Sequence, residues 1–159
     1  MNPKEAELNE IRDMLIDSNM FNRLKAAEYR SAAPYFGINN YREGETIFKE
    51  GDKGTFMCIV MAGRVSVIKS DMDGNDVVMG IEGVGHVFGE MAVLDSEPRS
   101  ATCAAKTHCQ LLTLAKTSMD AMIVEQPHIG AEVIRSIAIN LSHRMRFAAG
   151  RLVDRLEQD

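Results

Sequence analysis

Residues 88–102 read FGEMAVLDSEPRSAT, a segment that joins two predicted strands and includes a short helical turn over residues 90–94. The start of a helix presents free backbone N–H groups and the positive end of a dipole. Gly89, just before that start, lets an anion approach the backbone closely. Arg99 adds a planar fork of donors that matches the oxygens of a phosphate. The segment therefore predicts an anion site around Gly89 and Arg99.

Glu90 lies inside this predicted anion site, where a carboxylate would be repelled by a phosphate. It has a role there if it accepts hydrogen bonds from a neighbouring hydroxyl, such as the 2′-hydroxyl of a ribose. Arg99, backbone N–H groups, the hydroxyl of Ser100 and Glu90 together favour a nucleotide monophosphate site. The alternative is a solvated loop in which Glu90 and Arg99 pair with each other, and spacing alone leaves both interpretations open.

The length of 159 residues corresponds to about one domain, and the composition changes twice along the chain. Residues 1–33 contain helix formers and no glycine, residues 34–116 contain most of the glycines, and residues 117–159 return to a helical pattern. In the middle zone, β-rich runs separated by Gly or Asp-Gly predict an all-β roll, barrel or sandwich. The predicted strands are residues 45–48, 56–62, 64–69, 76–81, 101–105 and 109–115.

The predicted helices flank this β zone. In the N-terminal zone, a second short helix is expected over residues 22–32. In the C-terminal zone, Thr117 or Ser118 is expected to cap a short helix. Pro127 suits the first turn of a long helix, which carries a narrow apolar seam. The seam consists of Ile134, Ala138, Leu141, Met145, Ala148 and Leu152. Two interpretations stay open, since the seam can lie on the β core or meet a partner helix in a dimer.

The charge and the absence of apolar runs exclude several classes of protein. A net charge of -5 argues against direct nucleic-acid binding. The sequence contains no run of about 18 apolar residues, so no transmembrane helix is predicted. The first residues are polar and predict no secretory signal. The three cysteines are too few for a disulfide framework, so a reducing cytoplasm is the expected location. The histidines and cysteines lack zinc-site spacing, so no metal is expected.

The pattern F-G-E-x-A-x-L followed by P-R-[STA]-A-T in residues 88–102 resembles the phosphate-binding cassette of cyclic nucleotide-binding domains. Residues 44–52, GETIFKEGD, resemble the first hairpin of that family, and residues 56–63 resemble its y-x-I-x-x-G strand and turn. The resemblance extends over about residues 20–147. This part of the chain resembles the ligand domain of catabolite activator proteins and the regulatory subunit of the kinase in that family.

This resemblance implies a mainly β fold with flanking helices: a jelly-roll-like β-roll, or double-stranded β-helix, with N-terminal helices and C-terminal hinge and lid helices. It also implies that Glu90 holds the ribose hydroxyl and Arg99 holds the cyclic phosphate. Backbone amides after Gly89 and after Arg99 would complete the phosphate shell. The ligand-binding residues carried over are Gly89, Glu90, Met91, Ala92, Arg99, Ser100 and Ala101.

The chain departs from the transcription factors of that family in two places. Ala148 and Ala149 stand where those proteins place a Thr-Ser pair that reaches adenine. Too few residues follow for a helix-turn-helix domain, so no DNA binding is expected. Ser100 stands where a Thr in many relatives contacts the amino group of guanine, which leaves the base preference open. We favour cyclic AMP, with a cyclic GMP sensor as the alternative.

These observations predict a single-domain, non-catalytic sensor whose ligand is cAMP and which has no cofactor. A hinge helix over residues 118–125 would move when ligand binds, and a lid helix over residues 128–157 would close over the base. A phosphodiesterase would need a metal cluster or a general base, and the sequence shows neither. A degenerate module that only binds proteins is the other alternative. Expected partners are the nucleotide, an unknown effector protein and a second copy of the chain.

Overall fold

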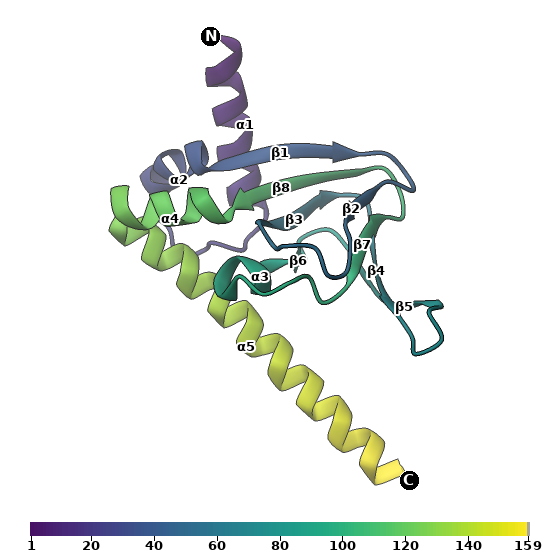
Figure 1. Cartoon of the computed structure of the whole chain (residues 1–159). Helices are drawn as coiled ribbons and strands as arrows, with labels where there is room; N and C mark the ends of the chain where they lie inside the picture. The colour runs from purple at the N-terminus through teal and green to yellow at the C-terminus, as the bar shows by residue number, and fades with distance from the viewer. Residues whose placement is uncertain (159) are drawn as a thin grey trace.

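The structure is a computed structural model that describes residues 1–158, in which two four-stranded antiparallel sheets are flanked by helices (Figure 1). The helices are α1 (Pro3–Asp17), α2 (Ala26–Ala32), the short 3-10 helix η1 (Ala33–Tyr35), α3 (Glu90–Asp95), α4 (Lys116–Glu125) and α5 (Pro127–Gln158). The strands are β1 (Phe36–Tyr41), β2 (Thr46–Phe48), β3 (Phe56–Ala62), β4 (Val65–Ser70), β5 (Asp76–Glu82), β6 (Val87–Phe88), β7 (Thr102–Ala105) and β8 (Cys109–Ala115).

The strand order is β1-β8-β3-β6 in one sheet and β2-β7-β4-β5 in the other, so neighbouring strands are often far apart in sequence. Strands β6 and β7 belong to different sheets, and α3 lies in the connection between them. The predicted helical turn over residues 90–94 is confirmed by α3. This topology places residues 88–102 at the crossing from one sheet to the other.

Strands β3 and β8 are buried on both faces, which explains their nearly continuous apolar sequences. In β3, Met57 and Ile59 belong to a cluster shared with the helices, while Cys58 and Val60 belong to a second cluster between the sheets. We call the first the helical core and the second the roll core. Because successive side chains of a strand point to opposite faces, one strand supplies both cores. The predicted bounds 56–62 and 109–115 are confirmed for these two strands.

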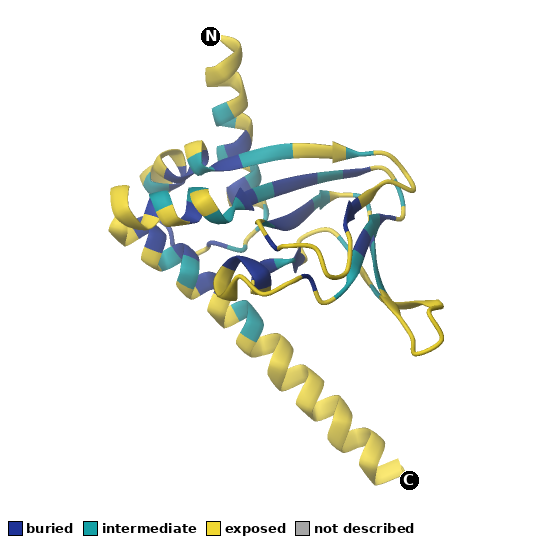
Figure 2. Ribbon diagram, in the orientation of Figure 1, coloured by how far each residue is buried: buried dark blue, intermediate teal, exposed yellow. Residues whose placement is uncertain are grey.

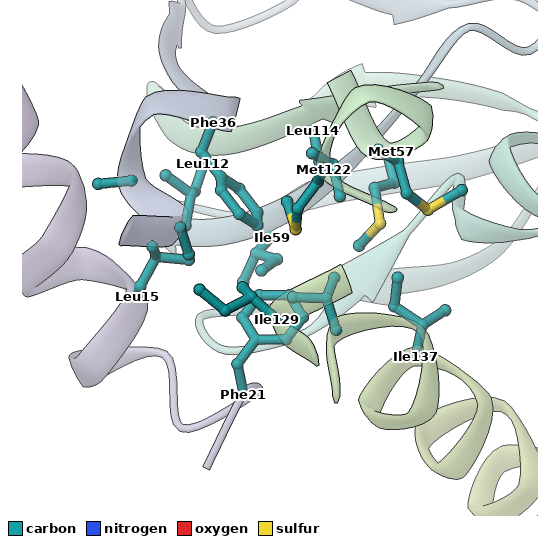
Figure 3. Packing of buried hydrophobic residues seen from close by; sticks show 14 of the residues in the cluster. Leu15, Phe21, Phe36, Met57, Ile59, Leu112, Leu114, Met122, Ile129 and Ile137 are labelled. Carbon is teal, nitrogen blue, oxygen red and sulfur yellow. The ribbon is translucent and has the colours of Figure 1, made fainter. Parts of the chain in front are cut away.

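The helical core joins the ends of the chain to the first sheet (Figure 3). Leu15 of α1 and Phe21 pack with Leu112 of β8, and Met122 of α4 and Ile137 of α5 complete the same cluster. The rings of Phe21 and Phe36 meet edge to face at 5.6 Å between centroids. The helices at both ends of the chain are therefore fixed to the sheet by shared apolar burial.

Several predicted elements differ from the observed ones. Strands β1 and β6 were not predicted, because the sequence FGINNY of β1 contains residues that favour turns and β6 has only two residues. Pairing with β8 through six residues holds β1 extended. Helix α2 begins at Ala26 rather than residue 22. The expected cap at Thr117 or Ser118 is wrong, since α4 begins at Lys116 directly after β8.

The predicted start of the long helix at Pro127 is confirmed, but its packing face is not the predicted seam. The buried residues of α5 are Ile129, Gly130, Val133, Ser136 and Ile137. Of the seam, Ile134 and Leu141 pack partly against the helical core, and the other four residues are exposed. The face in contact is therefore rotated by one residue, because Val133 and Ile137 rather than Ile134 and Ala138 point to the sheet.

The C-terminal half of α5 extends beyond the β-roll and is exposed from residue 142 onward (Figures 1 and 2). It carries large apolar side chains that face solvent, including Met145, Phe147, Leu152, Val153 and Leu156. None of the helices within residues 1–158 combines the length and the apolar character needed to cross a membrane.

Replacing Leu112 by Ala tests whether the helical core dominates stability. Leu112 is 1% exposed, so the variant loses apolar burial and leaves a cavity. We expect a loss of about 2–5 kcal/mol in the free energy of unfolding. Val124→Ala is the control, because Val124 is 79% exposed and should change stability by less than about 0.5 kcal/mol. Urea unfolding measures both, and equal effects would contradict this assignment of the core.

Candidate functional site

A cavity of about 330 Å³ lies where residues 88–102 face the second sheet and α5. Its volume falls in the range of small-molecule pockets, roughly 300–1,000 Å³. All seven residues that the sequence singled out line it: Gly89, Glu90, Met91, Ala92, Arg99, Ser100 and Ala101. The fold thus brings the whole predicted set to one place.

Gly89 sets the backbone conformation at the start of α3. It is the N-cap residue, has a φ of 74° and therefore adopts the left-handed conformation that favours glycine. A Cβ at this position would lie 2.7 Å from Nη1 of Arg99 and 3.3 Å from Cε2 of Phe48. The absence of a side chain is required both by the backbone conformation and by the close approach of Arg99.

Arg99 is almost fully buried, with 4% of its surface exposed. Its guanidinium carbon lies 3.8 Å from the centroid of the Phe48 ring and 4.9 Å from that of Phe56. Nη1 donates to the carbonyl of Gly89 at 2.9 Å, and Nη2 donates to the carbonyl of Phe56. Burial lowers the pKa of Arg99, although the group stays charged because an arginine starts far above neutral pH.

The backbone of Arg99 is also fixed. Its N–H donates to the carbonyl of Asp52, and its carbonyl accepts from the N–H of Gly51, each at 2.8 Å. The side-chain Nε is buried without a hydrogen-bond partner, and no ion pair within residues 1–158 includes Arg99. A buried cation that lines a cavity and lacks a counter-ion is suited to bind an anion there.

Glu90 is the other buried charge of the cavity, with 3% exposure. Its Oε1 accepts a short hydrogen bond from Nη1 of Arg144, a residue of α5. Burial raises the pKa of Glu90, and the positive charge of Arg144 opposes that rise. The alternative in which Glu90 and Arg99 pair with each other is therefore wrong, since Glu90 has a different partner.

Arg144 is a residue of the site that the sequence interpretation missed. It lines the cavity, although 54 residues separate it from Glu90. The available signal was helical spacing, because Val133, Ile137, Asn140 and Arg144 recur every three or four residues and share one face. The seam through Ile134 and Leu141 drew attention to a neighbouring face instead, so Arg144 was not singled out.

The two alanines that stand in place of the Thr-Ser pair of related transcription factors lie outside the cavity. Neither Ala148 nor Ala149 lines the cavity, and Arg144 is the only residue of α5 among those that do, within the part of the chain that the structure describes. Ser100 is an exposed residue that also lines the cavity. The wall of the cavity next to the helix is thus charged rather than apolar.

The cysteines and histidines give no sign of metal chemistry. Cys58, Cys103 and Cys109 are buried free thiols, and burial raises the pKa of Cys103 to about 12. No group of three or more His, Cys, Asp or Glu side chains in residues 1–158 is placed to hold a metal ion. The charged residues that line the cavity are Glu82, Glu90, Asp95, Glu97, Arg99 and Arg144.

Comparison with known proteins identifies a matching family model, the cyclic nucleotide-binding domain, over residues 38–126. The "Cyclic AMP receptor protein" of Thermus thermophilus is 31% identical over 131 residues, which cover 82% of this chain and 59% of that protein. The "cAMP-dependent protein kinase regulatory subunit" of Mycosarcoma maydis is 36% identical over 91 residues, covering 57% of this chain and 17% of that protein. The chain thus spans little more than half of the first relative.

Among solved structures, a cyclic nucleotide-binding domain from Methylobacillus flagellatus superposes with a TM-score of 0.80. The two sequences are 23% identical, and the match covers 93% of this chain and 83% of that one. This likeness concerns the fold, a jelly-roll of two antiparallel sheets with flanking helices, and confirms the predicted fold class.

Substituting Gly89 tests how closely the backbone must approach Arg99. Gly89→Ala is expected to cost about 1–2 kcal/mol for the left-handed backbone, and more because the new Cβ displaces Arg99. Gly85→Ala is the matched control, since Gly85 has a φ of 85° and an added Cβ there has open space. Urea unfolding should show a larger loss for Gly89→Ala, and equal losses would contradict the close approach.

Proposed function

The chain belongs to the cyclic nucleotide-binding domain family, and from this premise we propose that it is a non-catalytic sensor whose ligand is cAMP. Arg99 would bind the cyclic phosphate, with backbone amides of Met91, Ala92, Ser100 and Ala101 around it. Glu90 would accept the hydrogen bond of the ribose 2′-hydroxyl. No cofactor takes part in this proposal.

The observation that carries the proposal is the unpaired, buried guanidinium of Arg99 in a cavity that also contains Glu90. A phosphate would supply the missing counter-ion and an acceptor for Nε. A carboxylate at the same cavity disfavours a ligand that is anionic throughout, such as inorganic phosphate. A cyclic monophosphate joined to a ribose satisfies both groups, because it presents an anion and a hydroxyl on one rigid molecule.

The choice of cAMP rests on relatives such as the two described above, both of which carry cyclic AMP or cAMP in their names. The alternative is cGMP, since Ser100 is an exposed residue of the cavity whose hydroxyl would be available to the amino group of a guanine in the syn form. Titrations with cAMP and cGMP side by side distinguish the two, and 5′-AMP tests whether the cyclic phosphate is required.

Regulation would act through the C-terminal helices. Helix α4 packs against α5 and the end of β8, so a change at the cavity that moves α5 also moves α4. We propose that ligand binding favours a closed position of α5, because only a difference in affinity between two positions makes a ligand a switch. The effector that reads this change is a protein of another kind or a further part of a longer chain.

We also propose a symmetric dimer through the exposed half of α5. Its exposed apolar side chains continue the predicted seam at Met145, Ala148 and Leu152, and up to Leu156 they extend over about three turns of helix. Exposed apolar area of this kind marks an interaction surface. A two-fold dimer is the simplest closed assembly for one such helix.

Arg99→Ala tests the proposed function. Removing one member of a buried charge pair costs roughly 2–5 kcal/mol, so cAMP should bind about thirty-fold or more weakly. Calorimetric titration measures the change, and Arg64→Ala is the control because Arg64 is exposed and lies outside the cavity. Unchanged affinity in Arg99→Ala, or wild-type protein that binds neither cAMP nor cGMP, would refute the proposal.

Leu152→Glu tests the dimer. Leu152 is 60% exposed in one copy, so the added charge should leave the fold intact and separate two copies. Light scattering should show a dimer for wild type and a monomer for the variant, with and without cAMP. His143→Glu adds a charge on the opposite face of α5 and should stay dimeric. A wild type that remains monomeric at high concentration would rule out the dimer.

A further inference from the structure

Glu82, at the end of β5, is a charged residue of the cavity that the proposed phosphate and ribose contacts leave unused. Its side chain is 18% exposed and lines the cavity together with Glu90 and Arg99. In the antiparallel pairing of β4 with β5, Glu82 lies directly opposite Val65, a buried residue of the roll core. Directly opposite residues share one face of a sheet, so the Glu82 side chain leaves β5 on the face that also bears the roll core.

The two carboxylate oxygens of Glu82 have different surroundings. Oε2 lies 2.9 Å from Nδ1 of His86, at the other end of the turn that follows β5. Oε1 lies 3.9 Å from Nη2 of Arg144, which is longer than a hydrogen bond, and no donor within residues 1–158 bonds to it. An acceptor without a donor, on a residue that lines a cavity, is available to a donor group of a ligand.

The charged groups of the cavity follow the order Arg99, Glu90, Glu82. One guanidinium, that of Arg144, lies within 4 Å of both carboxylates, so Glu82 and Glu90 are neighbours. Burial raises the pKa of Glu90, and the charge of Glu82 raises it further. Burial lowers the pKa of Arg99, and Asp52 and Glu90 are the carboxylates of the described residues that oppose this fall. The charge of Glu82 therefore acts on Glu90 but not on Arg99, which places Glu90 between them.

The covalent structure of a cyclic nucleotide follows a matching order. The ribose carbon that bears the 2′-hydroxyl is bonded directly to the carbon that bears the base. With the phosphate on Arg99 and the hydroxyl on Glu90, the base begins beside Glu90, where Glu82 is the next charged group. The strands leave room there, because a Cβ added to Gly80 would meet no atom within 4 Å. Val67, the partner of Gly80 on β4, lines the cavity and offers an apolar contact to a purine ring.

We propose that Glu82 recognises the base of the bound nucleotide, through a hydrogen bond from the 6-amino group of adenine to its Oε1. This inference rests on the proposed function and deepens it, because it assigns the choice of base to β5, whereas Ala148 and Ala149 of α5 lie outside the cavity. Since His86 occupies the other oxygen, the carboxylate offers one acceptor, which suits the single amino group of adenine. A 6-carbonyl, as in hypoxanthine or guanine, turns lone pairs toward the carboxylate and is repelled.

The experiment is calorimetric titration of wild type and Glu82→Gln with three ligands that differ only at position 6 of the purine. These are cAMP, the cyclic monophosphate of purine riboside, which lacks the amino group, and the cyclic monophosphate of inosine, which carries a carbonyl. Wild type should bind cAMP about tenfold more tightly than the purine analogue, because the analogue cannot donate to a charged acceptor. The inosine analogue should bind more weakly still, because its carbonyl faces the carboxylate.

Glu82→Gln should change the ratios between the three affinities. Removing a negative charge strengthens the binding of any anion to a similar extent, so the ratios rather than the single affinities report on the base. The preference for cAMP over the purine analogue should shrink to about twofold, because a neutral amide is a weaker acceptor. The inosine analogue should bind the variant more tightly than it binds wild type, because the amide can donate to the carbonyl. Binding of the purine analogue shows that the variant is folded.

Two further variants serve as controls. Glu97→Gln removes the charge of another carboxylate that lines the cavity, two residues before Arg99 in the chain. It should shift the three affinities together and leave their ratios as in wild type. His86→Gln removes the partner of Oε2 but keeps the carboxylate of Glu82, so cAMP should remain the preferred ligand.

The outcomes separate this inference from the proposed function. If wild type binds the three ligands equally, or if Glu82→Gln keeps the wild-type ratios, only the contact between Glu82 and the base is wrong. Wild type that prefers the inosine analogue or cGMP to cAMP would also overturn this contact. A variant that loses all three ligands alike would show that Glu82 has a structural role alone. If wild type binds no cyclic nucleotide, both proposals fall.

Discussion

Arg99 is removed from water between the rings of Phe48 and Phe56, and it keeps its charge there through carbonyl oxygens and ring faces rather than through a carboxylate. Burial of an unpaired cation is unfavourable, so the surrounding structure must supply every one of these contacts. The carbonyl of Gly89 is one of them, which makes the path of the backbone before α3 part of the same arrangement. The guanidinium is thereby held in position before any anion arrives, and less freedom remains to be lost on binding.

The contacts of Arg99 come from both sheets, and this explains why the cavity depends on the whole roll. Phe48 belongs to β2 in one sheet and Phe56 to β3 in the other, while Gly89 follows β6. Glu90, one residue further, takes its counter-ion from α5 instead. Two buried charges of opposite sign therefore lie in one cavity without pairing, because Arg99 is held by carbonyls and rings of the roll and Glu90 by Arg144 of the helix. This separation leaves each charge able to meet a different part of one ligand.

Local sequence determined those elements whose signals lie within a few residues. The continuous apolar runs of β3 and β8 gave the observed bounds, since strands buried on both faces must be apolar at successive positions. Pro127 marked the start of α5 because a proline is tolerated in the first turn of a helix. The segment of residues 88–102 named the cavity residues through its resemblance to a known cassette, because the spacing of glycine, carboxylate and guanidinium alone left a solvated loop open. In contrast, β1 depends on its partner β8, and its own sequence favours turns.

The orientation of α5 is what tertiary structure alone decided. Two stripes of its sequence have helical spacing, one through Ile134 and Leu141 and one through Val133 and Ile137, and they differ by a rotation of one residue. Periodicity shows that such a helix is amphipathic, but the choice of the inner stripe depends on the shape of the surface against which it packs. That choice carries Arg144 to Glu90 across 54 residues of sequence. The sequence by itself determined most of the elements from local pattern, and its resemblance to a known family indicated the roll and the residues that line the cavity. The pairing of Glu90 with Arg144 depends on how the helix packs in the tertiary structure, because a contact between distant residues has no local signal in the sequence.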